Sequence, residues 1–405
     1  MKDVHLKKYY LLVFTIVGML LSNCKSDKAI QGFELADKDV RGTIKSLTLK
    51  QLNVESTFSD TVANSGFSSL LLLGEFDNIS SQVLLKFEAI PDSGNISRVA
   101  LILTTSDFLG GASENSAFTA QVHAVTSDWK ENQVTAASFN DAFSSESIAS
   151  VEIQPISKVV VGVDTSGADI TASEQVRFAF NASGIDLVNS WSDTSINKNY
   201  GILIDFQGSR FIKEFFSRTN LSNQPKLEIE TFNGTKRDTV TVTASQDAFI
   251  AKKLFEPPSG PLYVDDLFNH QTVLEFDLSS ISKESTINNA SFKMTIDPQN
   301  TILNETTTVL QVVRLKKEFV PLKTFTIDSS FVPLVVSVKN SDEEISVPIR
   351  SLLQGWVLQV IDNFGFIIRT AGPGRDANRL AFYSSNLDPE KSPRIEADFT
   401  VAPTN

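Results

Sequence analysis

The sequence predicts an all-β protein. Phenylalanine contributes 29 of the 405 residues, whereas methionine, which favours helices, contributes 3. Short apolar or alternating runs are separated by loops rich in Ser, Asn, Asp and Gly, a pattern typical of strands joined by turns. Three such runs are Val83–Phe87, Val99–Leu103 and Val240–Thr243. The hydrophobic content of 41% is enough to fill the cores between such sheets.

A second observation is that the later half of the chain repeats the earlier half. Val176–Ile204 holds an alternating strand, a short helical turn with Trp191, and an Asn-Tyr-Gly before an apolar strand. Ile345–Ile368 holds the same parts in the same order, with Trp356 and Asn-Phe-Gly. The interval between the copies far exceeds the roughly 20 to 50 residues of solenoid and propeller repeats. We therefore expect two tandem domains, each with its own core and one short helix.

The N-terminal stretch, residues 1–23, has the composition of a secretion signal peptide. A charged beginning is followed by the apolar run Tyr9–Leu21, which is shorter than the roughly 20 residues needed to span a bilayer. The run leads into Leu-Ser-Asn-Cys, which resembles a bacterial lipobox. Cys24 is the sole cysteine and cannot form an internal disulfide, so lipidation at Cys24 accounts for it. An ordinary signal peptide followed by an unmodified Cys24 is the alternative.

The domain boundaries follow from composition and from the repeat. We expect residues 24–41, which are polar and charged, to form a flexible tether. The first β-sandwich domain is expected at residues 42–232 and the second at 238–401. Residues 233–237, with Asn-Gly and a basic pair, form the linker between them.

Charge excludes one class of partner. The chain has 36 Lys and Arg against 48 Asp and Glu, and an acidic protein lacks the basic footprint that nucleic acid requires.

In the strand Phe118–Ala124 the apolar residues alternate with polar ones, so we expect His123 to face solvent.

Several motifs recur in the same order in both halves. Leu84–Leu103 matches Val273–Met294, and Glu214–Glu230 matches Leu380–Ala397. Together with Ser-Asp-Trp after the strand at Val122, the helix-Trp unit and Asn-aromatic-Gly, they resemble DNRLRE-type domains, which are grouped with carbohydrate-binding module family 96. The resemblance implies two jelly-roll-like antiparallel β-sandwiches that bind polysaccharide, of a kind often appended to secreted glycan-degrading enzymes or surface proteins.

This sequence departs from the family pattern at two places. The first copy has Phe-Glu-Ala at Phe87 where the second has Phe-Asp-Leu, and the second copy has Lys-Glu-Phe at Lys317 where the first has Ser-Asp-Trp. These departures bear on a shared ligand site more than on the fold.

The tryptophans have different expected roles. Trp191 and Trp356 each follow a leucine by four residues, Leu187 and Leu352, and so share a helical face with it. We expect both rings to pin their helix to the core. Trp129 follows Ser-Asp at a strand end, and either core packing or stacking on a sugar ring fits that position.

Basic residues are the other candidate ligand site. They surround a Gly-rich loop in the second copy and lie at the matching place in the first: Arg369, Arg375 and Arg379, and Arg210, Lys213 and Arg218. Such clusters could hold the carboxylates of a uronate polymer through bidentate pairs. The alternative is a solvated loop that balances neighbouring acids.

Enzyme signatures are scarce. Behind the signal the chain has two histidines, His123 and His270, and no cysteine beyond Cys24, which excludes a Cys-His pair and a multi-histidine metal site. No cofactor is expected; adjacent Asp265 and Asp266 could contribute to a structural Ca²⁺ site but form no complete motif. A carboxylate pair for glycoside hydrolysis stays open, although the repeat leaves no segment for a separate catalytic domain.

These observations lead to one expected function and two alternatives. We expect a non-catalytic polysaccharide-binding lipoprotein of the bacterial cell envelope, held by its lipid at the outer membrane or cell surface, with anionic uronate glycans as candidate ligands and glycan-degrading enzymes as candidate partners. The first alternative is a structural or adhesin-like envelope protein without glycan binding. The second is a polysaccharide lyase or hydrolase.

Overall fold

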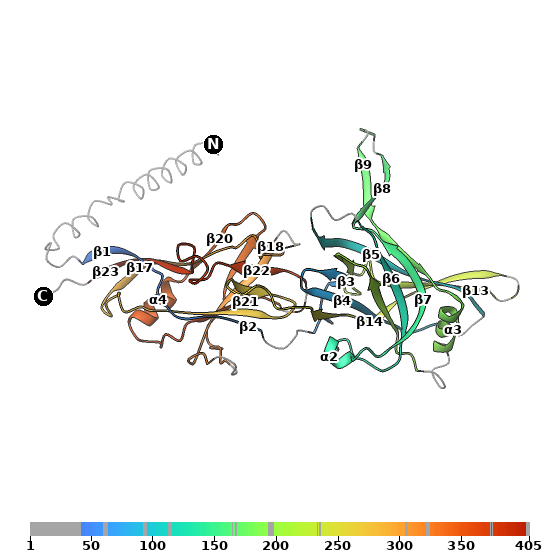
Figure 1. Ribbon diagram of the computed structural model, residues 1–405, viewed down its shortest axis with the longest axis horizontal. Helices are drawn as coiled ribbons and strands as arrows, with labels where there is room; N and C mark the ends of the chain where they lie inside the picture. The colour runs from blue at the N-terminus through green and yellow to red at the C-terminus, as the bar shows by residue number, and fades with distance from the viewer. Residues whose placement is uncertain are drawn as a thin grey trace, which may run out of the picture.

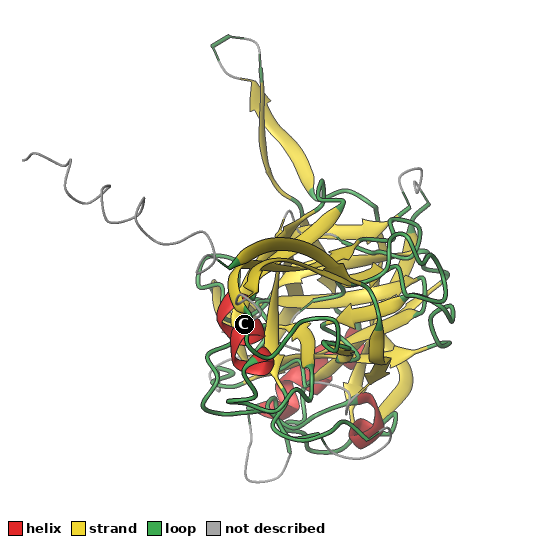
Figure 2. Ribbon diagram, turned by 90° about the vertical axis from the view of Figure 1, so that its left-hand side faces the viewer, coloured by secondary structure: helices red, strands yellow, loops and turns green. Residues whose placement is uncertain are grey.

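The computed structural model describes residues 42–401 apart from short gaps at 60–63, 92–94, 112–115, 164, 167, 193–197, 233, 235, 304–306, 321–324, 373 and 375. Within this part the fold is all-β, as predicted, with antiparallel sheets of ten, five and four strands and two small two-stranded sheets (Figures 1 and 2). The helices here are α2 (Ala136–Phe139), α3 (Ala182–Trp191) and α4 (Arg350–Val357). None of the helices in these residues is long and apolar enough to cross a membrane. Cys24 lies outside the described residues.

The strands gather in two lobes that lie side by side along the long axis (Figure 1). The N-lobe contains β3 (Leu70–Phe76), β4 (Ile79–Phe87), β5 (Asn95–Gly110), β6 (Phe118–Val125), β7 (Phe143–Ile153), β8 (Lys158–Val163), β9 (Asp169–Ser173), β10 (Gln175–Ala179), β11 (Ile202–Gln207), β12 (Phe211–Phe216), β13 (Lys226–Phe232) and β14 (Arg237–Lys253). The C-lobe contains β1 (Thr43–Leu49), β2 (Leu52–Ser59), β15 (Leu262–Asp265), β16 (His270–Phe276), β17 (Thr286–Thr295), β18 (Thr307–Arg314), β19 (Leu334–Lys339), β20 (Glu344–Pro348), β21 (Phe366–Thr370), β22 (Arg379–Phe382) and β23 (Arg394–Val401).

Both lobes pair their strands in the same order. In the C-lobe, one sheet runs β1-β23-β17-β20 and the other β19-β18-β21-β16-β2. In the N-lobe, the start of β14, then β13, the start of β5 and β10 pair in the first order. Strands β7, β6, β11, β4 and the end of β14 pair in the second. β14 runs from the first group into the second, and β5 reaches β4 through β12 and β3, so ten of the N-lobe strands join into one sheet.

The two copies exchange their first strands. β1 and β2 are the first strands of the described residues, yet β1 pairs with β23 and β2 with β16, both in the C-lobe. β14, which opens the second copy, pairs with β13 and β4 of the N-lobe. Glu55 on β2 accepts the N–H of Ser385 at 2.9 Å, and Asp247 on β14 accepts the N–H of Arg218 at 2.5 Å, so the two strands make equivalent contacts in opposite lobes.

This pairing differs from the boundaries expected at 42–232 and 238–401. A hairpin explains the difference at the middle of the chain, because β13 and β14 follow one another closely and pair antiparallel from Phe232 opposite Arg237. The repeat identifies which residues are equivalent, but it does not say which lobe an end strand joins. The C-lobe therefore takes β1 and β2 from the N-terminal end of the described chain.

Each lobe has its own aromatic-rich core. In the C-lobe, Phe292 and Phe366 meet edge to face at 4.7 Å between ring centroids, and Trp356 stacks on Phe366 at 6.1 Å. Trp356 is 4% exposed and Trp191, its counterpart in the N-lobe, 3%. Both tryptophans therefore pack helices α4 and α3 against the sheets, as predicted.

The Asn-aromatic-Gly motif is a structural turn in both lobes. Gly201 and Gly365 have φ of 82° and 76°, and a Cβ there would lie 2.1 and 2.2 Å from the carbonyl oxygens of Leu85 and Leu274. Just before each glycine, Asn199 and Asn363 donate to a strand carbonyl and accept the glycine N–H. The motif therefore positions β11 and β21 beside β4 and β16.

A polar contact made by a buried arginine joins the lobes. Arg379 on β22 is 5% exposed, pairs with Asp77 at 2.7 Å and donates to Asn78 Oδ1 at 3.0 Å, in the turn between β3 and β4. The chain also passes between the lobes twice, after Ser59 and after Lys253. Two connections and the ion pair between buried Arg379 and Asp77 restrain the lobes relative to one another.

Candidate functional site

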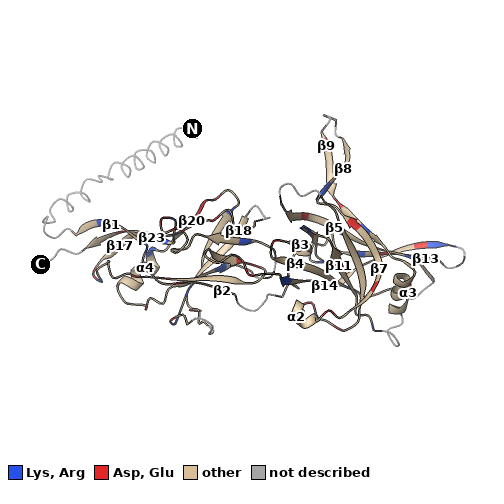
Figure 3. Ribbon diagram, viewed as in Figure 1, with Lys and Arg blue, Asp and Glu red and all other residues tan. Residues whose placement is uncertain are grey.

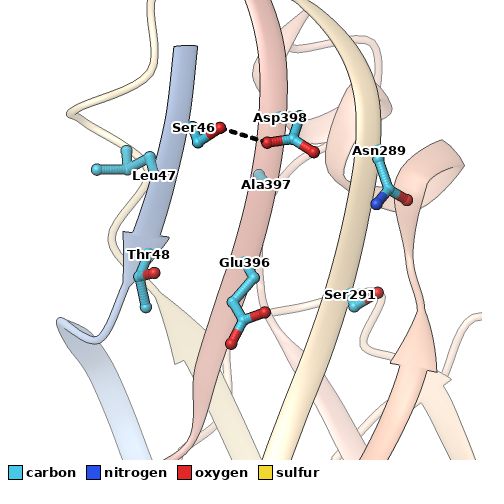
Figure 4. Close-up of a pocket in the computed structure, with 8 residues that line it drawn as sticks. All are labelled: Ser46, Leu47, Thr48, Asn289, Ser291, Glu396, Ala397 and Asp398. Atoms are coloured by element: carbon cyan, nitrogen blue, oxygen red, sulfur yellow. Dashed lines mark hydrogen bonds between the residues drawn. The ribbon is translucent and has the colours of Figure 1, made fainter.

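The C-lobe presents a polar face on the outside of its four-stranded sheet. On β23, Ile395, Ala397 and Phe399 are buried in the core, so the alternating residues Glu396 and Asp398 face outward. Hydroxyl and amide side chains from the neighbouring strands complete the face, as Figure 4 shows. They line a hollow of about 290 Å³ with Ser46 and Thr48 on β1 and Asn289 and Ser291 on β17.

The carboxylates on this face have different surroundings. Lys293 Nζ lies 2.8 Å from Glu396, whose pKa is lowered chiefly by that hydrogen bond. Arg394 Nε donates to the same carboxylate at 3.1 Å. Asp398 accepts a hydrogen bond of 2.6 Å from Ser46 Oγ. One end of the hollow is therefore neutralised, while Asp398 leaves the other end negative and rich in acceptors.

The equivalent face of the N-lobe is filled by arginines. Glu228 and Glu230 on β13 correspond to Glu396 and Asp398, because both pairs follow Pro-Lys/Arg-Leu/Ile. Arg177 pairs with Glu228, and Arg237 pairs with Glu230 at 2.9 Å. The strand partner of Glu230 is Arg98, whereas the strand partner of Asp398 is Asn289. Short side chains thus open a hollow in the C-lobe where the N-lobe has long cationic ones.

A larger hollow of about 780 Å³ lies beside the end of α4. Ile281, Trp356 and Val357 form buried apolar parts of its wall, and Lys283 donates to Gln359 at 2.8 Å at its polar rim. The Nε1 of Trp356 is buried and has no acceptor among the described residues. This hollow is a second concave surface, but its tryptophan belongs to the core and offers no open ring face.

A carboxylate pair lies within the N-lobe. Asp247 is 2% exposed, and burial raises its pKa to about 7. Burial also acts to raise the pKa of Glu131, but hydrogen bonds from Arg218 and from the Asp247 N–H outweigh it, and the pKa of Glu131 is lowered. Arg218 lies 2.6 and 2.7 Å from the two Glu131 oxygens. The pair is closed off by its own arginine and by burial, which leaves Asp247 out of reach of a polymer.

Trp129 lies in the core rather than on a sugar-binding surface. It is 6% exposed, packs with Val134 and Phe139, and donates its Nε1–H to the Tyr200 carbonyl at 2.8 Å. The alternative of a stacking platform is wrong, because the residues after the strand end, including helix α2, cover the ring.

Most of the predicted basic residues are already engaged. Lys213 is fully buried and bound to the Glu174 carboxylate and two carbonyls, and Arg379 is the buried link between the lobes. Arg218 holds Glu131, and Arg369 donates to Gln311 Oε1 at 3.3 and 3.2 Å. Arg375 lies outside the described residues.

Arg210 has an exposed side chain, but it does not join Arg218 in one site. The two arginines stand at opposite ends of β12, and Lys213 between them points into the protein. The expectation of a shared uronate-binding cluster is therefore wrong for Lys213 and Arg379, because sequence proximity around a strand does not bring side chains to one surface.

The two histidines are both buried. His123 is 5% exposed, its Nδ1 lies 3.1 Å from the Glu146 carbonyl, and Phe143 covers its ring at 5.3 Å. The expected solvent-facing position is wrong, because the first residues of β7 cover this side of β6. His270 pairs with the Asp265 carboxylate, which also accepts the Phe268 N–H at 2.8 Å.

Asp265 is thus committed to internal contacts rather than to a calcium site. In the described part of the chain no three His, Cys, Asp or Glu side chains are grouped as metal ligands. Sequence reasoning missed the outer face of β1, β17 and β23. The alternation Glu-Ala-Asp in β23 was a signal for it, but the partner strands β1 and β17 lie far from β23 in the sequence.

Comparisons with known proteins add little. No protein-family model matches the chain, and no curated protein matches it. A structural comparison finds the crystal structure of the infectious bursal disease virus VP2 subviral particle, at 11% identity over 91% of this chain and 79% of that chain, with a TM-score of 0.12. That score is too low to indicate a shared fold.

Proposed function

We propose that this chain is a lipid-anchored, non-catalytic polysaccharide-binding protein of the bacterial cell envelope. The binding surface in this proposal is the outer polar face of the C-lobe, and the observation that carries it is the hollow lined by Ser46, Asn289 and Asp398 (Figure 4). Hydroxyl, amide and carboxylate groups at one surface can donate to and accept from the hydroxyls of a sugar. The resemblance to DNRLRE-type domains and their jelly-roll-like sandwiches, and the lipobox before Cys24, support the same role.

The chemistry of the face favours neutral, hydroxyl-rich polysaccharides over uronates. Asp398 carries a negative charge that a Ser46 hydroxyl does not neutralise, and a like charge on the ligand is unfavourable there. The basic residues that motivated uronate binding are spread over separate places and are largely paired. We therefore choose neutral glycans as the ligand class, with glycan-degrading enzymes as the functional partners.

Affinity electrophoresis tests the proposal. Native gels would contain a β-glucan, a galactomannan, a xylan or, as the uronate, an alginate. We expect one neutral polymer to retard the protein, and Ser46→Ala with Asn289→Ala to raise its dissociation constant about 10- to 30-fold, since each lost hydrogen bond contributes about 1 kcal/mol. The control is Thr239→Ala with Arg98→Ala at the equivalent places of the N-lobe. Unchanged retardation of the C-lobe variant would contradict the assigned face.

A structural or adhesin-like role is the second candidate. The Arg379–Asp77 ion pair and the two chain crossings between lobes favour it, because they suit a rigid spacer. Absence of retardation by every polymer would leave this role as the better one. The carboxylates Glu131 and Asp247 do not favour a lyase or hydrolase, since Asp247 is 2% exposed.

A further inference from the structure

A two-stranded arm projects from the N-lobe. β8 and β9 pair with each other and stand away from the body of the lobe, as both views show (Figures 1 and 2). The arm lies between β7 and β10 in the sequence, and in the C-lobe the counterparts of those two strands, β19 and β20, are joined by residues 340–343 alone. The repeat thus serves as an internal control: the sandwich of strands forms without an arm, so the arm serves a purpose other than the fold.

A buried lysine binds both ends of the arm. Lys213 is 0% exposed, and its Nζ donates to the Gln154 carbonyl at 3.0 Å, to the Ile156 carbonyl and to the Glu174 carboxylate. These acceptors lie at both roots of the arm. In the armless C-lobe the position of Lys213 is occupied by Leu380, which is also buried. A buried charge is costly unless it is paired. Because its acceptors lie at both ends of the arm, Lys213 fixes the orientation of the arm on the lobe.

The surface of the arm is apolar and nearly uncharged. Val160, Val161, Val163 and Ile170 are 58%, 60%, 61% and 48% exposed. Lys158 and Asp169 are the charged residues of its two strands, in a chain whose net charge is −12. Figure 3 shows the contrast with the charged strands of the lobe below. The two strands of the arm therefore carry an apolar, β-branched surface with one residue of each charge, beyond an acidic body.

Its open edges indicate what kind of partner it takes. An isolated hairpin is marginally stable in water, and within the described residues the outer edges of β8 and β9 are unpaired. Unpaired backbone groups are costly in lipid, and the arm has no aromatic ring to stack on a sugar. A second β-strand satisfies both the backbone and the apolar side chains.

The edge of β9 is the better one for pairing. β8 has a bulge around Val161, a device that blunts an edge. β9 has the regular sequence Asp169-Ile170-Thr171-Ala172-Ser173. Placed antiparallel to itself about Thr171, this strand sets Thr171 against Thr171, Ile170 against Ala172 and Asp169 against Ser173. No like charges oppose one another, and Thr–Thr pairs are favourable across strands.

We propose that two copies of this chain associate through their arms, β9 pairing antiparallel with β9 of the second copy to form a four-stranded sheet. The apolar strands of the arms meet while the acidic bodies stay apart. A face of one arm measures roughly 20 Å by 10 Å from strand rise and spacing, well below the roughly 800 Å² per partner of a stable interface. The contact is therefore weak in solution, and tethering to one membrane raises its effective concentration.

Substitutions of Thr171 by residues of opposite charge test the pairing. The full mature chain, with Cys24→Ser to keep it soluble, would be followed by sedimentation equilibrium up to millimolar concentration. We expect a weak monomer–dimer equilibrium for the parent chain. Thr171→Lys or Thr171→Glu alone should weaken it at least about 10-fold, because like charges then face each other. An equimolar mixture of the two variants should restore association to the parent level or above.

A cysteine variant checks the register directly. In the Cys24→Ser background, Thr171→Cys should give a disulfide dimer under mild oxidation, while Leu221→Cys, 85% exposed and off the arm, should stay monomeric. A parent chain that is monomeric throughout, or a dimer that neither Thr171→Lys nor Thr171→Glu weakens, overturns the proposal. Equal cross-linking of both cysteine variants also overturns it.

Discussion

The two lobes share one strand order but differ at single residues. Lys213 is replaced by Leu380 in the lobe that lacks the arm, and Arg98 is replaced by Asn289 where the outer hollow opens. Asp247 and Glu55 keep one contact, the acceptance of a backbone N–H after β12 or β22. The contacts that hold the fold are thus duplicated, while the residues that distinguish the lobes lie at the arm and on the outer face.

Asp247 should make stability depend on pH. Burial raises its pKa to about 7 in the folded state from 3.8, so the folded protein holds the proton more tightly than the unfolded chain. This contribution is complete below about pH 4 and is lost as pH rises to about 7. Glu131, whose pKa is lowered, acts in the opposite sense and at lower pH. Between about pH 4.5 and 7 the free energy of unfolding should therefore fall with rising pH.

Asp247→Asn should flatten this dependence, because an amide does not titrate yet can still accept the Arg218 N–H. The change across the window should be a few kcal/mol at most, at about 1.4 kcal/mol per pKa unit. Urea unfolding at pH 4.5 and pH 7 measures it, with Asp128→Asn at a largely exposed carboxylate as the control. An equal slope in Asp247→Asn and the parent would refute the assignment.

The two lobes differ in which strands complete their sheets. β14 closes the N-lobe as a continuation of β13, whereas β1 and β2 close the C-lobe from the far end of the sequence. The arm of β8 and β9 is an addition to one lobe, held at its roots by Lys213. The repeat thus shows which strands are equivalent, but it does not show which lobe a terminal strand of a copy will pair with.

Lys213→Leu tests the link between the buried lysine and the arm. The variant leaves the Glu174 carboxylate and two carbonyls without their donor, so we expect a loss of about 3 to 5 kcal/mol in the free energy of unfolding. Hydrogen exchange should accelerate in residues 158–173. Adding Glu174→Leu should recover part of the stability. Unchanged exchange in the arm of Lys213→Leu would show that the arm is oriented by other contacts.

The described part of the molecule is a pair of lobes joined by exchanged strands and by the ion pair between Arg379 and Asp77. The N-lobe strands, β3 to β14, are continuous in sequence, whereas the C-lobe needs β1 and β2 from before them. A cut between β13 and β14 therefore removes a paired strand from one lobe and leaves two strands without partners. Domain boundaries drawn from the repeat and from strand pairing lead to different stable fragments.

Two fragments distinguish these boundaries. We expect residues 64–261, which keep β3 to β14 together, to unfold cooperatively with β-type circular dichroism. Residues 42–232 keep β1 and β2 without β23 and β16 and lose β14, so we expect aggregation or a much lower midpoint of urea unfolding. Equal midpoints for the two fragments would mean that the exchanged strands contribute little to stability.

The sequence by itself determined what depends on local pattern. Alternation and short apolar runs predicted the all-β class, and the spacing of motifs revealed the repeat. Leu–Trp spacing in α3 and α4 placed Trp191 and Trp356 in the cores. These features follow from the periods of helix and strand, and those periods can be recognised from residues that are close together in the sequence.

The tertiary structure alone decided the rest. Whether β1 pairs with β13 or β23, whether Lys213 and Arg379 are buried, and whether Asp398 meets Ser46 all depend on segments far apart in the chain. A basic residue beside a strand looks the same in sequence whether it faces solvent or a buried carboxylate. The free energy of burial depends on which partner the fold brings to it, and that partner is absent from the local pattern.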